Sequence, residues 1–128
     1  MTDRPQRVLV VEDNDMNMQL VEYLLEEGGY EIVKATSGEE ALSITRDASS
    51  KAPDLILMDI HLPGVDGLSV VRELKSDPRT SAIPVLALTA HAMRGDKDRF
   101  LLAGCDGYIS KPIDVKTFLS SIEQYVPK

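Results

Sequence analysis

A short apolar run that ends in a carboxylate sets the strongest limit on how this chain folds. Residues 55–58 read Leu-Ile-Leu-Met and are followed by Asp59, after which Pro63, Gly64 and Gly67 mark a loop. An apolar run of this length, placed after a proline, predicts a strand that is buried on both faces. A carboxylate at the end of such a strand is costly unless a cation pairs with it. Asp59 is therefore the residue that most needs an explanation.

Similar apolar runs predict buried strands at residues 8–11, 85–88 and 108–109, and residues 31–35 predict a more exposed strand. Between the strands, apolar residues recur at helical spacing. The predicted helices begin at Asn14 or Asp15, at Ser37, at Gly67, within residues 90–103 and at Asp114. This alternation predicts an α/β fold, a five-stranded parallel sheet flanked by five helices. We choose the strand order 2-1-3-4-5 because it makes the first and third strands neighbours, as a site shared by their acidic residues requires.

The same spacing predicts which side chains enter the core. Four methionines are expected in the core or at its rim: Met16, Met18, Met58 and Met93. Four apolar residues of the last helix are expected to face inward: Val115, Phe118, Leu119 and Ile122. The single cysteine, Cys105, is expected to be a small packed residue.

Composition narrows the function. A chain of 128 residues is long enough for one domain with a real core, and we expect residues 1–128 to form a single domain. The net charge of −7 argues against binding to nucleic acid or to an anionic membrane. No apolar run approaches the roughly 18 residues of a membrane span. The N-terminus has no apolar signal region, and Cys105 has no cysteine to pair with, so we expect a cytoplasmic protein.

Polar residues that are capable of chemistry follow four of the predicted strands. Glu12 and Asp13 follow the first strand, Asp59 the third, Thr89 the fourth and Lys111 the fifth. The ends of parallel strands meet at one edge of the sheet, where crowded carboxylates repel one another unless a cation lies among them. Oxygen ligands without a His or Cys cluster favour Mg²⁺. With a lysine and a hydroxyl nearby, the set suits a phosphoryl group on or beside a carboxylate.

Four stretches of the sequence resemble the receiver domain of two-component response regulators. They are VLVVEDN, LILMDIHLPGVDG, VLALTA and YISKP, and the resemblance covers essentially the whole chain. Within the family the chain is most similar to single-domain regulators of the DivK type, and it also resembles receivers attached to hybrid histidine kinases. The resemblance implies a signalling module, whose partners are a histidine kinase or a histidine phosphotransfer protein and a downstream target protein.

The resemblance also implies the roles of the acidic residues. Asp59 matches the phosphoacceptor, which takes a phosphoryl group from a phosphohistidine of the partner. Glu12 and Asp13 match the acidic pair that holds Mg²⁺ together with Asp59, Asp13 more directly. The backbone carbonyl of His61 matches a further ligand of the metal. Glu12 stands where many members have aspartate, and its longer side chain could act through water.

The remaining matched residues belong to the switch of the family. Thr89 matches the hydroxyl that moves toward the phosphoryl group, and Tyr108 matches an aromatic residue that changes rotamer with it. Lys111 matches the lysine that pairs with the phosphoryl group, and the Lys111–Pro112 peptide is expected to be cis. The surface formed by the fourth helix, the fifth strand and the fifth helix then changes its preference for partners. The oligomeric state implied is a monomer or a weak dimer.

Each of these residues also has an ordinary structural interpretation when it is taken alone. These are a loop cap for Asp59, helix N-caps for Glu12, Asp13 and Thr89, a solvated surface lysine for Lys111 and simple packing for Tyr108.

Two other functions remain open. A small Mg²⁺-dependent phosphatase would work through the same aspartyl phosphate, but no acid stands two residues after Asp59 to serve as general acid. A flavin or nucleotide binder would suit the fold, but the acidic loop EDNDMN lacks the glycines of a phosphate cradle.

Overall fold

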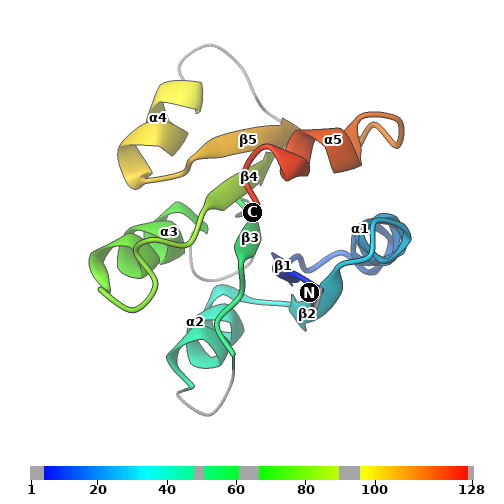
Figure 1. Cartoon of the computed structure of the whole chain (residues 1–128). Helices are drawn as coiled ribbons and strands as arrows, with labels where there is room; N and C mark the ends of the chain where they lie inside the picture. Colours follow the sequence, from blue (N-terminus) through cyan, green and yellow to red (C-terminus); the bar gives the residue numbers. More distant parts are fainter. Residues whose placement is uncertain (1–4, 48–50, 61–66, 90–95, 127–128) are drawn as a thin grey trace.

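The computed structural model describes residues 5–47, 51–60, 67–89 and 96–126 of the chain (Figure 1). Its elements alternate between strand and helix throughout. The strands are β1 Arg7–Val11, β2 Glu31–Ala35, β3 Leu55–Asp59, β4 Val85–Thr89 and β5 Gly107–Ser110. The helices are α1 Asp15–Glu27, α2 Gly38–Arg46, α3 Gly67–Ser76, α4 Asp96–Ala103 and α5 Phe118–Glu123.

All five strands are parallel and lie in the order β2-β1-β3-β4-β5. This confirms the predicted order and places β3 at the centre of the sheet. In the register, Val11 pairs with Met58, Asp59 with Leu88, and Thr89 with Ser110. The last residues of β1, β3, β4 and β5 therefore reach the same edge of the sheet.

Helices cover both faces of the sheet, which explains why the strand sequences are apolar without alternation (Figure 1). One core cluster joins Leu9, Ile56 and the other residues on their side of the sheet to α2, α3 and α4. The second cluster joins Val8, Leu55 and their neighbours to α1 and α5. Successive residues of one strand thus enter opposite clusters, as the pleat requires.

The first two helices begin where the sequence predicts. Asn14 caps α1, since its side chain accepts a hydrogen bond from the Asn17 amide at 2.9 Å. Ser37 caps α2 by accepting from the Glu40 amide at 3.1 Å. The Glu40 carboxylate accepts from the Thr36 amide at 2.6 Å, which is one residue earlier than a capping box places this bond. The alternative that Glu12 or Asp13 caps α1 is therefore wrong.

Two predictions about packing are also wrong. Met16 is 80% exposed, because it lies two residues from buried Met18 and so roughly 200° around the helix from it. Val115 is 56% exposed, because α5 begins only at Phe118. Asp114 does not cap this helix with its side chain, which accepts instead from the Lys116 amide at 3.0 Å.

The other core predictions hold where the structure can test them. Met18, Met58, Cys105, Phe118 and Ile122 are buried, and Leu119 is half-buried. Met93 lies outside the described residues. Within the part of the chain that the structure describes, no helix has the length and apolar character to cross a bilayer.

Candidate functional site

The polar residues singled out in the sequence gather at one edge of the sheet. Glu12 directly follows β1, Asp59 is the last residue of β3, and Thr89 is the last residue of β4. Lys111 follows β5, and its backbone amide donates to the Thr89 carbonyl oxygen at 2.7 Å. Four different strands thus supply one site, and β3 places Asp59 between the contributions of β1 and β4.

Three carboxylates form the acidic part of this site. Glu12, Asp13 and Asp59 each offer one oxygen, and these oxygens lie within 4.8 Å of one another. Glu12 is 1% exposed and Asp59 is 3% exposed, whereas Asp13 is open to solvent. Two buried carboxylates so close together are unfavourable unless positive charge compensates them.

Lys111 supplies positive charge to the cluster. Its Nζ lies 2.9 Å from Glu12 Oε1 and 3.3 Å from Asp59 Oδ2. Only 17% of its side chain is exposed, so the interpretation as a solvated surface lysine is wrong. The Lys111–Pro112 peptide is cis, as the family resemblance implies.

The pKa values of the cluster reflect crowding and burial. Burial raises the pKa of Glu12, the neighbouring Asp59 carboxylate raises it further, and the attraction of Lys111 opposes both. Burial lowers the pKa of Lys111, but Glu12 and Asp59 more than offset this, so that its pKa is raised. Lys111 therefore pairs with the two buried carboxylates, Glu12 and Asp59, and Asp13 adds a third acidic group to the cluster.

The donor set fits a hard divalent cation. Three carboxylates from two neighbouring strand ends are ligands that Mg²⁺ accepts, with water completing its shell. Glu12 Oε1 is buried, and Lys111 Nζ lies 2.9 Å from it. A cation at this place would add to the compensation that Lys111 gives the closely spaced carboxylates. The predicted carbonyl ligand, that of His61, lies outside the described residues.

A glycine brings α3 onto the backbone of the acidic strand. A Cβ added to Gly67 would lie 2.5 Å from the carbonyl oxygen of Asp59 and 2.9 Å from Ile60 Cα. The Gly67 amide also donates to the Ile60 carbonyl oxygen at 3.3 Å. The sequence marks Gly67 only as a turn residue; its close approach to Asp59 depends on the tertiary fold.

Thr89 and Tyr108 differ in their relation to the acidic cluster. Thr89 is fully buried at the same edge of the sheet. Tyr108 lies further back on β5 and is 36% exposed, and its ring centroid is 6.4 Å from that of Phe100 on α4. Tyr108 therefore belongs to a second feature of the surface.

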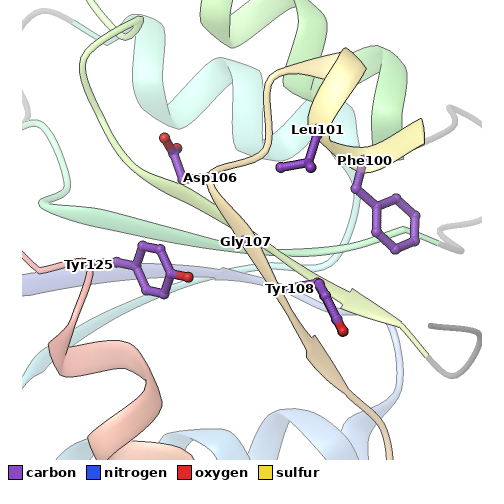
Figure 2. A pocket seen from close by; sticks show the side chains of 6 residues that line it. All are labelled: Phe100, Leu101, Asp106, Gly107, Tyr108 and Tyr125. Carbon is purple, nitrogen blue, oxygen red and sulfur yellow. The ribbon is translucent and has the colours of Figure 1, made fainter. Parts of the chain in front are cut away.

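That second feature is a pocket of about 200 Å³ beside the edge strand β5, which we call the β5 pocket (Figure 2). Its lining comes from α4, from β5 with the residue before it, and from the segment after α5: Phe100, Leu101, Asp106, Gly107, Tyr108 and Tyr125. Of these, sequence reasoning singled out only Tyr108 as functional. Figure 2 shows Tyr125 and Tyr108 on the two sides of Gly107.

Comparisons with known proteins agree with this architecture. A family model described as the response regulator receiver domain matches residues 8–123. The polar-differentiation response regulator DivK of Brucella ovis is 50% identical over 119 residues, which cover 93% of this chain and 94% of that protein. DivK of Brucella anthropi is 48% identical over 122 residues, which cover 95% of this chain and 97% of that protein.

Solved structures give the same result. The receiver domain of a sensor histidine kinase from Pseudomonas aeruginosa, which has a magnesium ion coordinated in its active-site cleft, superposes with a TM-score of 0.82 at 33% identity. That match covers 95% of this chain and 98% of the other. The chemotaxis protein CheY4 of Vibrio cholerae gives a TM-score of 0.88 at 26% identity, over 96% of this chain and all of the other. The acidic triad Glu12, Asp13 and Asp59 has the character of a receiver magnesium site. The chain therefore belongs to the response regulator receiver family and is a phosphoacceptor signalling module of two-component systems rather than a catalytic enzyme.

Proposed function

We propose that Asp59 accepts a phosphoryl group from a phosphohistidine, carried by a histidine kinase or by a histidine phosphotransfer protein. Membership of the receiver family implies a histidine kinase as partner. A carboxylate oxygen of Asp59 forms a bond to phosphorus while the phosphorus–nitrogen bond of the donor breaks, and the electron pair of that bond stays on the imidazole. The observation that carries the proposal is the buried Asp59 carboxylate between two acidic neighbours and Lys111.

Asp59 is a better acceptor than the other two carboxylates for a geometric reason. It ends the central strand, so that β1 with its acidic residues lies on one side and β4 with Thr89 on the other. Lys111 Nζ, 3.3 Å from Asp59 Oδ2, can pair with the oxygens of an incoming phosphoryl group. Asp13 is exposed and lies at the rim, where it is better placed to hold a cation.

We propose Mg²⁺ as the cofactor, held by Glu12, Asp13 and Asp59 and by the backbone carbonyl of His61. The hard oxygen donors and the close spacing of the three carboxylates support this assignment. When bound, the ion would neutralise charge on the phosphoryl oxygens and bring the donor close to the acceptor. Glu12 reaches the site with a longer side chain than the aspartate common in the family, which is consistent with a contact through water.

Thr89 and Tyr108 are proposed as the switch that carries the signal away from Asp59. Thr89 hydroxyl is drawn toward the phosphoryl group, and Tyr108 changes rotamer in response. The pairing of β4 with β5 supports this route, since Thr89 lies opposite Ser110 and Ala87 opposite Tyr108. We propose the surface of α4, β5 and α5 as the docking surface for a downstream protein. The β5 pocket lies beside it and is lined by residues of α4, of β5 and of the segment after α5.

We also propose a domain organisation, a location and an oligomeric state for the protein. Residues 1–128 are proposed to form a single receiver domain that acts in the cytoplasm as a monomer or weak dimer. The net charge of −7 supports protein partners rather than nucleic acid or an anionic membrane. The buried free thiol of Cys105 is consistent with a reducing compartment.

Intact mass spectrometry after incubation with acetyl phosphate and Mg²⁺ tests the acceptor. We expect one added phosphoryl group in the wild type, none in Asp59→Asn and none when EDTA is present. The matched control is Asp54→Asn, which changes a carboxylate at the opposite end of the same strand and should leave phosphorylation intact. Phosphorylation of Asp59→Asn at wild-type stoichiometry would show that another residue is the acceptor.

A second measurement separates rapid hydrolysis from an inability to react. Beryllofluoride imitates an aspartyl phosphate without being hydrolysed. If no adduct is seen by mass, we expect beryllofluoride and Mg²⁺ still to shift the amide resonances of Asp59 and Thr89. Unchanged resonances in both places would exclude the proposed function.

A further inference from the structure

A second polar cluster lies at the opposite edge of the sheet and is centred on Lys75. This residue is in the last turn of α3, and only 19% of its side chain is exposed. Its Nζ donates to the carbonyl oxygens of Ser81 at 3.3 Å and Ile83 at 2.8 Å, and to Asp106 Oδ2 at 3.0 Å. An ammonium group has three protons, so these three acceptors use it completely.

Asp106 extends this cluster to the beginning of two strands. Its Oδ2 also accepts from the Val85 amide at 2.8 Å, and its own amide donates to the Val85 carbonyl oxygen at 2.7 Å. Val85 is the first residue of β4, and Asp106 directly precedes β5. Lys75 is thereby connected to the N-terminal ends of both strands that carry the proposed switch residues.

The aliphatic part of Lys75 also supports the end of α4. Gly104 has a φ of +110°, and a Cβ at this position would lie 2.7 Å from Lys75 Cγ. The Gly104 amide donates to the Leu101 carbonyl oxygen, and the Cys105 amide donates to the Phe100 carbonyl oxygen, each at 3.0 Å. The turn at residues 104–106, which we call the α4–β5 turn, thus closes α4 directly over the lysine.

We propose that Lys75 is a positioning residue that fixes the α4–β5 turn, so that a change at Asp59 and Thr89 alters the β5 pocket at Tyr108 instead of displacing the turn. The proposal rests on the proposed function of Asp59. The paired strands β4 and β5 are held at one end by Lys75 and Asp106. A pair of strands that is fixed at one end can move mainly at the other, and the lining of the β5 pocket runs from the fixed end at Asp106 along β5 to Tyr108.

The proposal differs from a role in stability alone. Removal of the Lys75 ammonium group leaves Asp106 and two backbone carbonyl oxygens without this donor, and that alone lowers the free energy of unfolding. A positioning residue must in addition determine which residues respond when the distant site is occupied. The test therefore measures individual amides, with and without beryllofluoride.

The first measurement is amide hydrogen exchange by NMR on the full chain, without beryllofluoride. Lys75→Met keeps the aliphatic stem beneath Gly104 and removes the ammonium group. We expect about tenfold faster exchange at the amides of Gly104, Cys105 and Asp106, because local opening of the turn becomes easier. Lys34→Met, which removes an exposed ion pair with Glu22 elsewhere, is the control and should leave these amides unchanged. Unchanged exchange in Lys75→Met would overturn the proposal.

A milder variant keeps the test valid if Lys75→Met does not fold. Asp106→Asn retains an acceptor for the Val85 amide and loses only the negative charge. We expect faster exchange at the same three amides, by a smaller factor than in Lys75→Met. Acceleration elsewhere in the chain, with these amides unaffected, would contradict an anchoring role for the cluster.

The second measurement adds beryllofluoride and Mg²⁺. In the wild type we expect changes at Tyr108 and Ser110, while exchange in the α4–β5 turn stays within twofold. In Lys75→Met we expect the affinity for beryllofluoride to stay within twofold of the wild type. The change in amide exchange at Tyr108 should be reduced by at least half, and exchange should also change in the α4–β5 turn. A response of wild-type size and distribution in Lys75→Met would overturn the proposal. If the wild type shows no response to beryllofluoride, the proposed function of Asp59 is refuted. The exchange data collected without beryllofluoride do not depend on that function, so the two failures can be distinguished.

Discussion

The two edges of the sheet both carry charged side chains, but they compensate charge differently. At the N-terminal edge, each of three carboxylates accepts a hydrogen bond from a specific donor. The pairs are Glu31 with the Arg7 guanidinium, Asp54 with the Arg7 amide, and Asp106 with Lys75 and the Val85 amide. Glu31 and Asp106 also remain nearly half exposed, so water shares in their stabilisation.

At the C-terminal edge two carboxylates are buried and lie close together. Lys111 Nζ is within 3.3 Å of both Glu12 and Asp59, and Asp13 adds a third carboxylate. Both edges carry carboxylates, so their presence alone does not identify the functional edge. The difference lies in burial and in spacing, because one cation can be shared only by carboxylates that lie as close together as Glu12, Asp13 and Asp59.

The largest effect that we expect concerns the glycine at each edge. Gly67→Ala should lower the free energy of unfolding by about 3 kcal/mol, because the new Cβ would meet the backbone of Asp59 and Ile60. Gly104→Ala should cost less, about 1–2 kcal/mol, since its strain comes from the positive φ and from the side chain of Lys75, which can move. Urea unfolding of both variants measures the difference. Equal losses would show that the acidic edge is no more rigid than the other.

A somewhat smaller effect is expected on Mg²⁺ binding. Asp13→Asn removes one charge from the proposed ligands, and an interaction between unit charges a few ångströms apart near a protein surface is worth up to about 4 kcal/mol. We expect the affinity for Mg²⁺, measured by calorimetric titration, to fall by roughly tenfold to a hundredfold. Asp15→Asn, an exposed neighbour in the first turn of α1, is the matched control and should change it little. Equal losses in the two variants would indicate general attraction rather than a site.

Neutralising one carboxylate at each edge should change stability in opposite directions. In EDTA, Glu12→Gln should stabilise the protein by about 1 kcal/mol, because it relieves burial of charge and repulsion by Asp59. Asp54→Asn should destabilise it by about 1 kcal/mol, because it weakens the hydrogen bond from the Arg7 amide. Thermal unfolding of both variants gives the two signs. A loss of stability in both would mean that Lys111 already compensates the acidic edge.

The pH dependence of stability tests whether the effect of Glu12→Gln comes from the charge of Glu12. The pKa of Glu12 in the folded protein lies above its ordinary value of 4.5, so the folded state holds the proton more tightly than the unfolded state. The contribution of Glu12 to stability should therefore become more favourable as pH falls from above its folded pKa toward 4.5. The advantage of Glu12→Gln over the wild type, measured in EDTA, should shrink over that same interval. An advantage that is constant with pH would show that it does not come from the charge of Glu12.

The smallest effect is expected at a surface ion pair away from both edges. Arg46 Nη2 lies 3.5 Å from Glu73 Oε1 between α2 and α3, and both side chains are about half exposed. Solvent screens such a pair, so Arg46→Ala should change the free energy of unfolding by no more than about 0.5 kcal/mol. A decrease in the free energy of unfolding above about 1 kcal/mol would show that half-exposed ion pairs are strong in this protein. It would contradict our assumption that solvent weakens the half-exposed charge pairs of the N-terminal edge.

The sequence was sufficient for the fold and for the acidic edge because both depend on local patterns. Apolar runs without alternation identify strands that are covered on both faces. The polar residue that follows such a run then lies at the C-terminal edge of the sheet. The parallel arrangement alone brings Glu12, Asp59 and Lys111 to one edge. The strand order follows once the first and third strands are required to be neighbours.

Other features depend on contacts that no local pattern reveals. Lys75 and Asp106 come from different connections, and nothing in their spacing indicates that they meet at Val85. Met16 and Val115 were misplaced because helical spacing alone does not fix where a helix starts or which stripe faces the sheet. The β5 pocket combines α4, β5 and the end of the chain, so its lining also required the structure.

The distribution of the site over four strands has a consequence for the newly made chain. Glu12 lies near the beginning of the sequence, Asp59 near its middle and Lys111 near its end. During synthesis the acidic residues leave the ribosome long before the lysine that pairs with them, and pairing between such distant segments forms only when the sheet is nearly complete. A truncated or partly folded chain therefore has the acidic residues without the assembled site. Competence to react at this edge reports that the whole domain has folded.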